Sequence, residues 1–193
     1  MRTTDETRYC YDYPRPALTV DLVAFAIRDA SLLILLIRRK HDPFAGRWAL
    51  PGGFLEGEEP IEAGARRELE EETGLALAGP VDFLGVYGAP GRDPRGRTIS
   101  IAHVAMIRGE PPAIGGGDDA AEAAWLPARG LRGPLAFDHD EIVGDALRRL
   151  EDGVRSGRFG PRFLPEIHDE IEARSLLRVV LGEAATSGDP RAE

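Results

Sequence analysis

Hydrophobic residues gather in short runs along the chain, and polar or glycine-rich breaks separate these runs. Residues 18–27 and 31–37 are dense in Val, Leu, Ile, Ala and Phe, with a short polar break at residues 28–30. Short apolar runs bounded by turn residues are typical of buried strands, so this pair predicts a β-hairpin. The same pattern predicts a short extended segment and further strands, at residues 48–50, 81–87, 98–107 and 122–126.

The clearest helical pattern spans residues 60–73. The proline at its first position suits a first helical turn, where no backbone N–H is needed. Ile61, Ala65 and Leu69 recur at helical spacing and form one packing stripe. Gly74 is placed to end the helix, because glycine adopts the left-handed C-cap conformation without strain.

The order of these elements predicts the fold class. Strands interleaved with one strong helix indicate an α/β domain with a mixed sheet. After residue 134 the pattern becomes helical, with apolar residues at helical spacing over 138–155 and 165–181. We therefore expect an α/β domain and a short helical C-terminal appendage, followed by a small polar tail that is disordered. The predicted boundaries place these three parts at residues 1–133, 134–183 and 184–193.

Charge and composition narrow the function classes. The formal net charge is −9, and an acidic chain repels phosphate polymers, which argues against nucleic acid as a partner. Cys10 is the only cysteine, which excludes an intrachain disulfide and fits a cytoplasmic location. The longest apolar run, residues 32–37, is far shorter than the roughly 20 residues of a membrane helix, so no membrane partner is expected.

Three glutamates near the end of the predicted helix are the strongest chemical signal. Glu68, Glu71 and Glu72 stand at i, i+3 and i+4, so a helix places them on one face. Each like-charge pair costs about a few tenths of a kcal/mol, and the negative end of the helix dipole disfavours acids there. Hard Mg²⁺ or Mn²⁺ ions would relieve this repulsion. A solvated Glu-rich helix face is the alternative interpretation.

The surrounding residues 53–75 resemble the Nudix box, G-x5-E-x7-R-E-U-x-E-E-x-G-U, in which U is a bulky apolar residue. Every fixed position of that pattern is matched here, by Gly53, Glu59, Arg67, Glu68, Leu69, Glu71, Glu72, Gly74 and Leu75. So many fixed positions make the motif highly specific. With the segment before the box and the strands around it, the resemblance covers about residues 18–127.

The resemblance implies a Nudix α/β/α sandwich with a mixed sheet and metal-dependent hydrolysis of a nucleoside diphosphate derivative. It implies Mg²⁺ or Mn²⁺ as the cofactor, bound by Glu68, Glu71 and Glu72, with the carbonyl of Gly52 as a further ligand. The resemblance also implies that two other residues, Glu59 and Arg67, orient this cluster by ionic hydrogen bonds, as outer groups do at other metal sites.

The general base remains open between two places in the sequence. A metal-bound water becomes a nucleophile when a carboxylate removes its proton. Glu71 or Glu72 could do this within the helix. In Nudix hydrolases that cut ADP-ribose, a loop carboxylate outside the box can be the base, and Asp118, Asp119 or Glu122 would correspond to it. A solvated acidic turn is the alternative for these three.

The loop at residues 88–100 resembles the corresponding stretch of ADP-ribose pyrophosphatases in the same family. Arg92, Arg95 and Arg97 on this loop could hold a phosphate or a ribose edge. A solvated hairpin tip, with Asp93 pairing the arginines, is the alternative. The resemblance thus favours ADP-ribose, or a related ADP-sugar, as a small-molecule substrate that is cleaved to AMP and a sugar phosphate.

Aromatic residues supply candidates for a base contact. Phe54 and Tyr87 stand beside predicted loops and are our candidates for contact with adenine. Trp48 and Trp125 lie on strand-like segments, where packing in the core is expected. Residues 15–21 also resemble the ADP-ribose branch of the family.

Two other functions remain open. Residues 135–142 and 163–166 resemble regulators of NAD metabolism, which join a Nudix-like domain to a winged helix. That match fades after Glu166, and too little chain follows for a recognition helix and a wing. An appendage that packs on the Nudix domain, or on a second subunit in a homodimer, is therefore expected. His139 could reach the site from this part of the chain, but we expect a helix-start residue without a ligand role. A triphosphate pyrophosphatase that sanitises the nucleotide pool shares the same reaction class.

Overall fold

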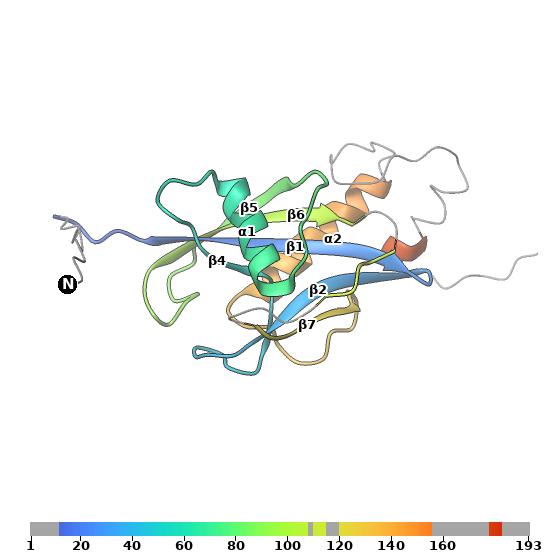
Figure 1. The fold of residues 1–193 in the computed structure, drawn as a ribbon, viewed down its shortest axis with the longest axis horizontal. Helices are drawn as coiled ribbons and strands as arrows, with labels where there is room; N and C mark the ends of the chain where they lie inside the picture. Colours follow the sequence, from blue (N-terminus) through green and yellow to red (C-terminus); the bar gives the residue numbers. More distant parts are fainter. Residues whose placement is uncertain (1–11, 108–109, 115–119, 156–177, 183–193) are drawn as a thin grey trace, which may run out of the picture.

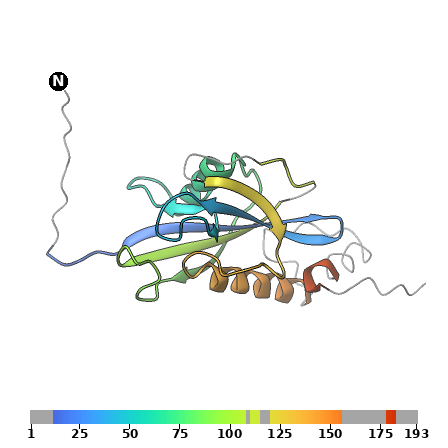
Figure 2. The same ribbon diagram turned by 90° about the horizontal axis from the view of Figure 1, so that it is seen from below.

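A mixed β-sheet separates two helices in the computed structural model, which describes residues 12–107, 110–114, 120–155 and 178–182. Helix α1, Ile61–Thr73, covers one face of the sheet, and helix α2, His139–Arg155, covers the other. Figure 2 shows the sheet between them, with α2 in orange along one side. The predicted α/β/α sandwich with a mixed sheet is therefore confirmed.

The sheet has the strand order β3-β2-β1-β6-β5, with β4 paired to β1 and β7 paired to β2 (Figure 1). Strands β1 and β6 run parallel along their whole shared length, and the other pairs are antiparallel. The strand bounds are β1 Ala17–Arg28, β2 Ser31–Arg39, β3 Trp48–Ala49, β4 Gly52–Phe54, β5 Asp82–Tyr87, β6 Thr98–Met106 and β7 Ala120–Pro127.

Strand β1 is apolar along most of its length because it is buried on both faces. Leu22 and Ala24 pack on the side of α1 with Leu69, whereas Val23 and Phe25 pack on the side of α2. A centrally placed strand with helices on both faces has no solvent-facing positions, so the usual alternation of polar and apolar residues disappears. The hairpin that joins β1 to β2 is confirmed.

Helix α1 begins and ends where the sequence predicts. Pro60 is its extended N-cap residue, and Gly74 adopts a left-handed φ of 72° at the C-cap. The Gly74 N–H donates to the carbonyl of Glu70 over 2.8 Å and closes the last turn. Leu69 is fully buried against the sheet, which turns the flanking glutamates toward β4 and solvent.

Helix α2 is a layer of the same packed unit. Ile142, Ala146 and Leu150 are fully buried against β1 and β2 residues, in one cluster with Phe25 and Ile34. The predicted boundary at residue 134 therefore falls inside this unit. An amphipathic helix is stable when its apolar side is buried, and α2 buries that side against the sheet face that α1 leaves open.

The remaining differences concern short segments. Strand β4 was not predicted, because a Gly-Gly-Phe stretch has no strand pattern of its own. It is a strand because it pairs with β1. The predicted helix at 165–181 lies mostly outside the described residues, of which 178–181 are helical. In the described residues, no helix has the length and apolar character needed to cross a membrane.

Candidate active site

A cleft of about 420 Å³ opens between the C-terminal half of α1 and the entry to α2. Thr19 and Asp21 of β1 line its floor. One group of lining residues, the acidic wall, comprises Gly52, Gly53, Arg67, Glu68 and Glu72. A second group, the arginine wall, comprises Arg92, Asp93, Arg95, Phe137 and His139, and Phe54 and Arg39 also line the cleft.

Glu72 is the most buried carboxylate of the acidic wall. The backbone N–H of Gly52 donates to its Oε2 atom over 2.9 Å, which ties α1 to the start of β4. Burial raises the pKa of Glu72 to about 8, although the bond from Gly52 acts in the opposite direction. A carboxyl group that is hard to ionise in this position gains most from a cation placed beside it.

The Glu68 carboxylate lies directly against the backbone of Gly53, so a side chain at position 53 would displace it. A Cβ atom at position 53 would stand 2.4 Å from the Glu68 Oε1 atom. Arg67 donates to the same carboxylate over 2.9 Å and to Glu59 over 2.7 Å. The bonds from Arg67 lower the pKa of Glu59 to about 2, so this ion pair is a firm support behind the helix.

Glu71 stands apart from the other two glutamates. Its carboxylate accepts a hydrogen bond from Arg67 over 3.0 Å, and its side chain is 57% exposed. It does not line the cleft. Across the described residues, no group of three or more acidic, histidine or cysteine side chains converges as a preformed metal cage. Of the three predicted glutamate ligands, Glu68 and Glu72 line the cleft, whereas Glu71 pairs with Arg67 outside it.

The acidic wall fits a hard divalent cation. Its donors are carboxylate oxygens of Glu68 and Glu72, held beside the backbone of Gly52 and Gly53. Mg²⁺ and Mn²⁺ prefer such oxygen ligands and usually keep several waters, so two or three carboxylates suffice.

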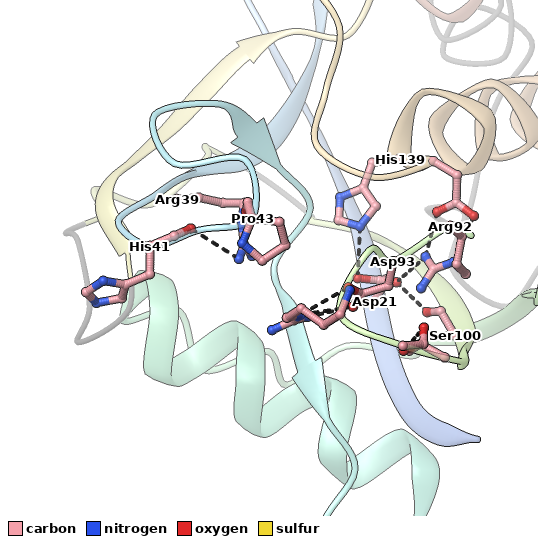
Figure 3. A network of polar contacts seen from close by, with 12 residues as sticks. Asp21, Arg39, His41, Pro43, Arg92, Asp93, Ser100 and His139 are labelled. Carbon is pink, nitrogen blue, oxygen red and sulfur yellow. Dashed lines mark hydrogen bonds and ion pairs between the residues drawn. The ribbon is translucent and has the colours of Figure 1, made fainter. Parts of the chain in front are cut away.

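A buried polar network includes the cleft floor at Asp21 (Figure 3). Asp21 of β1 accepts a hydrogen bond from the Ser100 hydroxyl of β6. The Arg92 Nη2 atom lies 3.7 Å from Asp21, and the same guanidinium binds Asp138 with both Nε and Nη2, over 2.8 and 2.6 Å. His139 places Nε2 3.5 Å from the Asp21 Oδ1 atom. The network joins β1, β6, the loop before β6 and the start of α2.

His139 is held through both nitrogen atoms of its ring. Its Nδ1 atom accepts the N–H of Leu50 over 2.9 Å, so the ring proton belongs on Nε2, which faces Asp21. Burial lowers the pKa of His139 further below its ordinary value, despite the nearby carboxylate of Asp21.

Arg95 forms the solvent-facing part of the arginine wall. Its guanidinium carbon lies 5.3 Å from the centre of the Phe54 ring and 5.7 Å from that of Phe137. Asp93 accepts its Nη2 hydrogen over 2.7 Å. Arg39, at the rim, lies 4.8 Å from the Phe137 ring centre. Guanidinium groups and aromatic rings thus contact one another along this part of the cleft.

A protein-family model described as the NUDIX domain matches residues 16–146. The chain belongs to the Nudix family. The match includes the acidic wall, the loop at residues 88–97 and the first half of α2. This chain is a Nudix hydrolase, because the ADP-ribose pyrophosphatase of Methanocaldococcus jannaschii is 46% identical over 137 residues, 70% of this chain and 76% of that protein.

Two further relatives of this Nudix protein carry ADP-ribose in their descriptions. The "ADPR responsive transcriptional repressor NtrR" of Acinetobacter baylyi is 31% identical over 176 residues, 89% of this chain and 69% of that protein. A cocrystal structure shows the NUDIX domain of Shewanella oneidensis NrtR complexed with ADP ribose, and the sequence of that domain is 33% identical to this one. The two structures superpose with a TM-score of 0.66 over 72% of this chain and 90% of that chain.

The Nudix cleft brings together only part of the predicted substrate contacts. Arg92, Arg95 and Phe54 line it. Arg97 does not, because its guanidinium turns back to the carbonyl of Gly88. Tyr87 lies on the α2 side of β5, where its hydroxyl donates to Asp145 over 2.8 Å, away from the cleft lining.

The loop carboxylates are only partly described. Asp118 and Asp119 lie outside the described residues. Glu122 is on β7 and lies 3.6 Å from Arg38 of the neighbouring strand, and it does not line the cleft. Trp48 and Trp125 pack against the core clusters, as the strand pattern indicates.

Several cleft residues were missed by sequence reasoning. Asp21 carried a signal, because an acid inside an apolar strand needs a buried partner. For His139, the sequence left two alternatives, a residue that reaches the site and a helix-start residue without a ligand role; the structure places it in the cleft lining, in contact with Asp21. Phe137 and Arg39 carried no local signal, because their place in the cleft depends on how α2 and the loop after β2 pack.

Proposed function

We propose that this Nudix hydrolase cleaves the pyrophosphate bond of ADP-ribose, or of a related ADP-sugar, to AMP and a sugar phosphate. The observation that carries the proposal is the presence of both walls in one cleft. Carboxylates suited to a divalent cation share it with guanidinium groups and aromatic rings suited to phosphate and base. The relation to an ADP-ribose pyrophosphatase supports the same substrate.

Glu68 and Glu72 would hold Mg²⁺ or Mn²⁺, with Glu71 joining them after it leaves Arg67 and the Gly52 carbonyl as a further ligand. When bound, the cation would neutralise the pyrophosphate oxygens and supply an acidic water. Glu59 and Arg67 orient the glutamates, because the Arg67 guanidinium binds Glu59, Glu68 and the carbonyl of Phe54.

The chain's own carboxylates would take the proton from the attacking water. In Glu72, the Gly52 N–H occupies Oε2, so Oε1 is the atom that remains to accept it. Glu71 is the second candidate, because its exposed carboxylate can turn toward the cleft. Asp118 and Asp119 remain proposals for a base from the loop.

The arginine wall would bind the two ends of the substrate. Phe54 is half exposed at the cleft, so its ring face can stack on adenine. Arg95 lies over this ring and is 45% exposed, which lets its outer N–H groups donate to a phosphate or ribose oxygen. Arg39 and Lys40 add positive charge at the rim of the same cleft.

A product assay on the full chain tests the proposal. ADP-ribose and an oxidised nucleoside triphosphate are incubated separately with Mg²⁺, and released AMP, sugar phosphate and pyrophosphate are quantified. We expect AMP and ribose phosphate from ADP-ribose, and no product when a chelator removes the metal. A kcat/KM about a hundredfold higher on the triphosphate, a difference of about 2.7 kcal/mol, would replace the substrate proposal with nucleotide-pool sanitation.

A second candidate, an ADP-ribose-responsive repressor, is favoured by the match to the Acinetobacter protein over 89% of this chain. We still expect no sequence-selective duplex-DNA binding at physiological salt, because the chain carries a net charge of −9. Gel-shift titrations of the full chain, with and without ADP-ribose, measure this directly. Nanomolar binding to one sequence that ADP-ribose releases would establish the repressor instead.

A further inference from the structure

The segment from β3 to β4 is held by hydrogen bonds from three sides. The Ala136 N–H donates to the Trp48 carbonyl over 2.8 Å, and the Leu50 N–H donates to His139 Nδ1 over 2.9 Å. The next two residues bond to other elements. The Leu22 N–H of β1 donates to the Pro51 carbonyl, and the Gly52 N–H donates to Glu72 of α1.

The His139 Nδ1 atom accepts the backbone N–H of Leu50 from the start of α2. His139 is 3% exposed, and its Nε2 atom faces Asp21. A carbonyl or imidazole nitrogen that accepts a buried backbone N–H cannot be lost without leaving that donor unsatisfied.

Asp21 reaches the same segment from the floor of the cleft. A Cβ atom at position 52 would stand 2.5 Å from the Asp21 Oδ1 atom, so this carboxylate lies directly against Gly52. Asp21 is itself held by the Ser100 hydroxyl and faces Arg92. Thus the imidazole fixes Leu50, the carboxylate limits Gly52, and only one residue separates these two points.

We propose that His139 is a positioning residue for the acidic wall. Its imidazole holds the Leu50 amide so that Gly52, two residues on, directs its N–H at Glu72 and keeps that carboxylate in the cleft. A side chain on one face of the sheet thereby orients a glutamate on the other face. The proposal rests on the proposed role of Glu72 as a metal ligand.

Three substitutions separate positioning from simple packing. His139→Asn keeps an acceptor, Oδ1, where Nδ1 stands. His139→Gln keeps an N–H near the place of Nε2 but has no acceptor toward Leu50. His139→Leu has neither group. Positioning therefore predicts the order Asn above Gln and Leu, whereas simple packing predicts that Leu, which fills an apolar space best, retains most function.

Mn²⁺ binding in the absence of substrate, followed by electron paramagnetic resonance, is the first readout. We expect Mn²⁺ affinity to fall about tenfold in His139→Gln and His139→Leu, and to stay within about threefold of the unaltered chain in His139→Asn, on the scale of outer-shell metal mutants. The kcat on ADP-ribose should follow the same order, with KM nearly constant. Urea unfolding reports how much stability each variant has lost.

His103→Leu is the matched control, because His103 is similarly buried but does not line the cleft. Its Mn²⁺ affinity should remain that of the unaltered chain. Equal Mn²⁺ affinity in all three His139 variants would overturn the positioning role, as would an unaltered chain that binds no Mn²⁺. If the unaltered chain binds Mn²⁺ but leaves ADP-ribose intact, only the substrate proposal fails, and the metal readout still decides the role of His139.

Discussion

The acidic wall of the cleft comes from one short stretch of chain, whereas the arginine wall is assembled from distant ones. Gly52, Gly53 and the helical glutamates lie within 21 consecutive positions, from residue 52 to residue 72. The arginine wall joins the loop before β6 to the start of α2, 46 residues apart at the bond between Arg92 and Asp138. The helical period places the glutamates of the acidic wall on one face of α1. The residues of the arginine wall come together only when the loop before β6 packs against the start of α2.

The two walls also differ in how their charges are held. In the acidic wall, burial raises the pKa values of Glu68 and Glu72, and this effect outweighs that of the nearby arginines. In the arginine wall Arg92 is enclosed by Asp21 and Asp138. An undercompensated cluster indicates a place for a cation, whereas a compensated network indicates a support.

The largest effect is expected at Glu72. Glu72→Gln should retain the fold, because the amide oxygen can still accept the Gly52 N–H. Turnover of ADP-ribose should fall by two or more orders of magnitude, roughly the scale of losing a metal ligand or its activated water. Steady-state kinetics and circular dichroism measure the two properties together. A folded variant with nearly full activity would show that Glu72 is not a ligand.

Arg92→Ala tests whether the arginine wall is a support. Arg92 is only 4% exposed, and its removal would leave Asp138 and Asp21 buried without their partner. We expect the free energy of unfolding to drop by about 3 kcal/mol, the usual cost of breaking a buried pair. Urea denaturation provides the measurement.

Arg148→Ala is the control for that experiment, since Arg148 pairs with Asp145 but is 69% exposed. Exposed pairs contribute about 0–1 kcal/mol, so its unfolding curve should hardly move. If both variants lost equally little free energy of unfolding, Arg92 would not be a structural support, and the substrate contact that the loop resemblance indicated would be favoured instead.

A smaller effect, confined to binding, is expected at Arg95. Arg95→Ala should raise KM for ADP-ribose by about tenfold and leave kcat within about threefold, as expected when uniform binding is lost. Arg97→Ala serves as the control and should leave KM unchanged, because Arg97 donates to the Gly88 carbonyl and does not line the cleft. A fall in kcat with constant KM would instead place Arg95 at the reacting phosphate.

The smallest effect is expected at Glu122. Its carboxylate pairs with Arg38 on the surface of β7 and β2, outside the cleft. Glu122→Gln should change kcat by less than about twofold, because a general base contributes roughly 100-fold or more. Parallel measurement of Glu71→Gln sharpens the result. A loss at Glu122 that matches the loss at Glu72 would identify it as the base.

Much of the acidic wall could be predicted from the sequence, because residues close along the chain determine the helix that carries its glutamates. The spacing of Glu68 and Glu72, the stripe that ends at Leu69 and the cap at Gly74 all follow from the helical period. The burial of Glu72 against Gly52 could not be predicted, because it depends on the pairing of β4 with β1.

The sequence by itself determined the helix α1, the hairpin of β1 and β2, the motif and the reaction class of the family. Each follows from residues that are close along the chain, where periodicity and turn chemistry act directly. Only the tertiary structure decided that Arg92 is a buried support while Arg95 faces the cleft, and that His139 contacts Leu50 from the start of α2. These outcomes depend on which long-range neighbour buries each polar group, because a buried charge or donor must find its partner wherever packing places it.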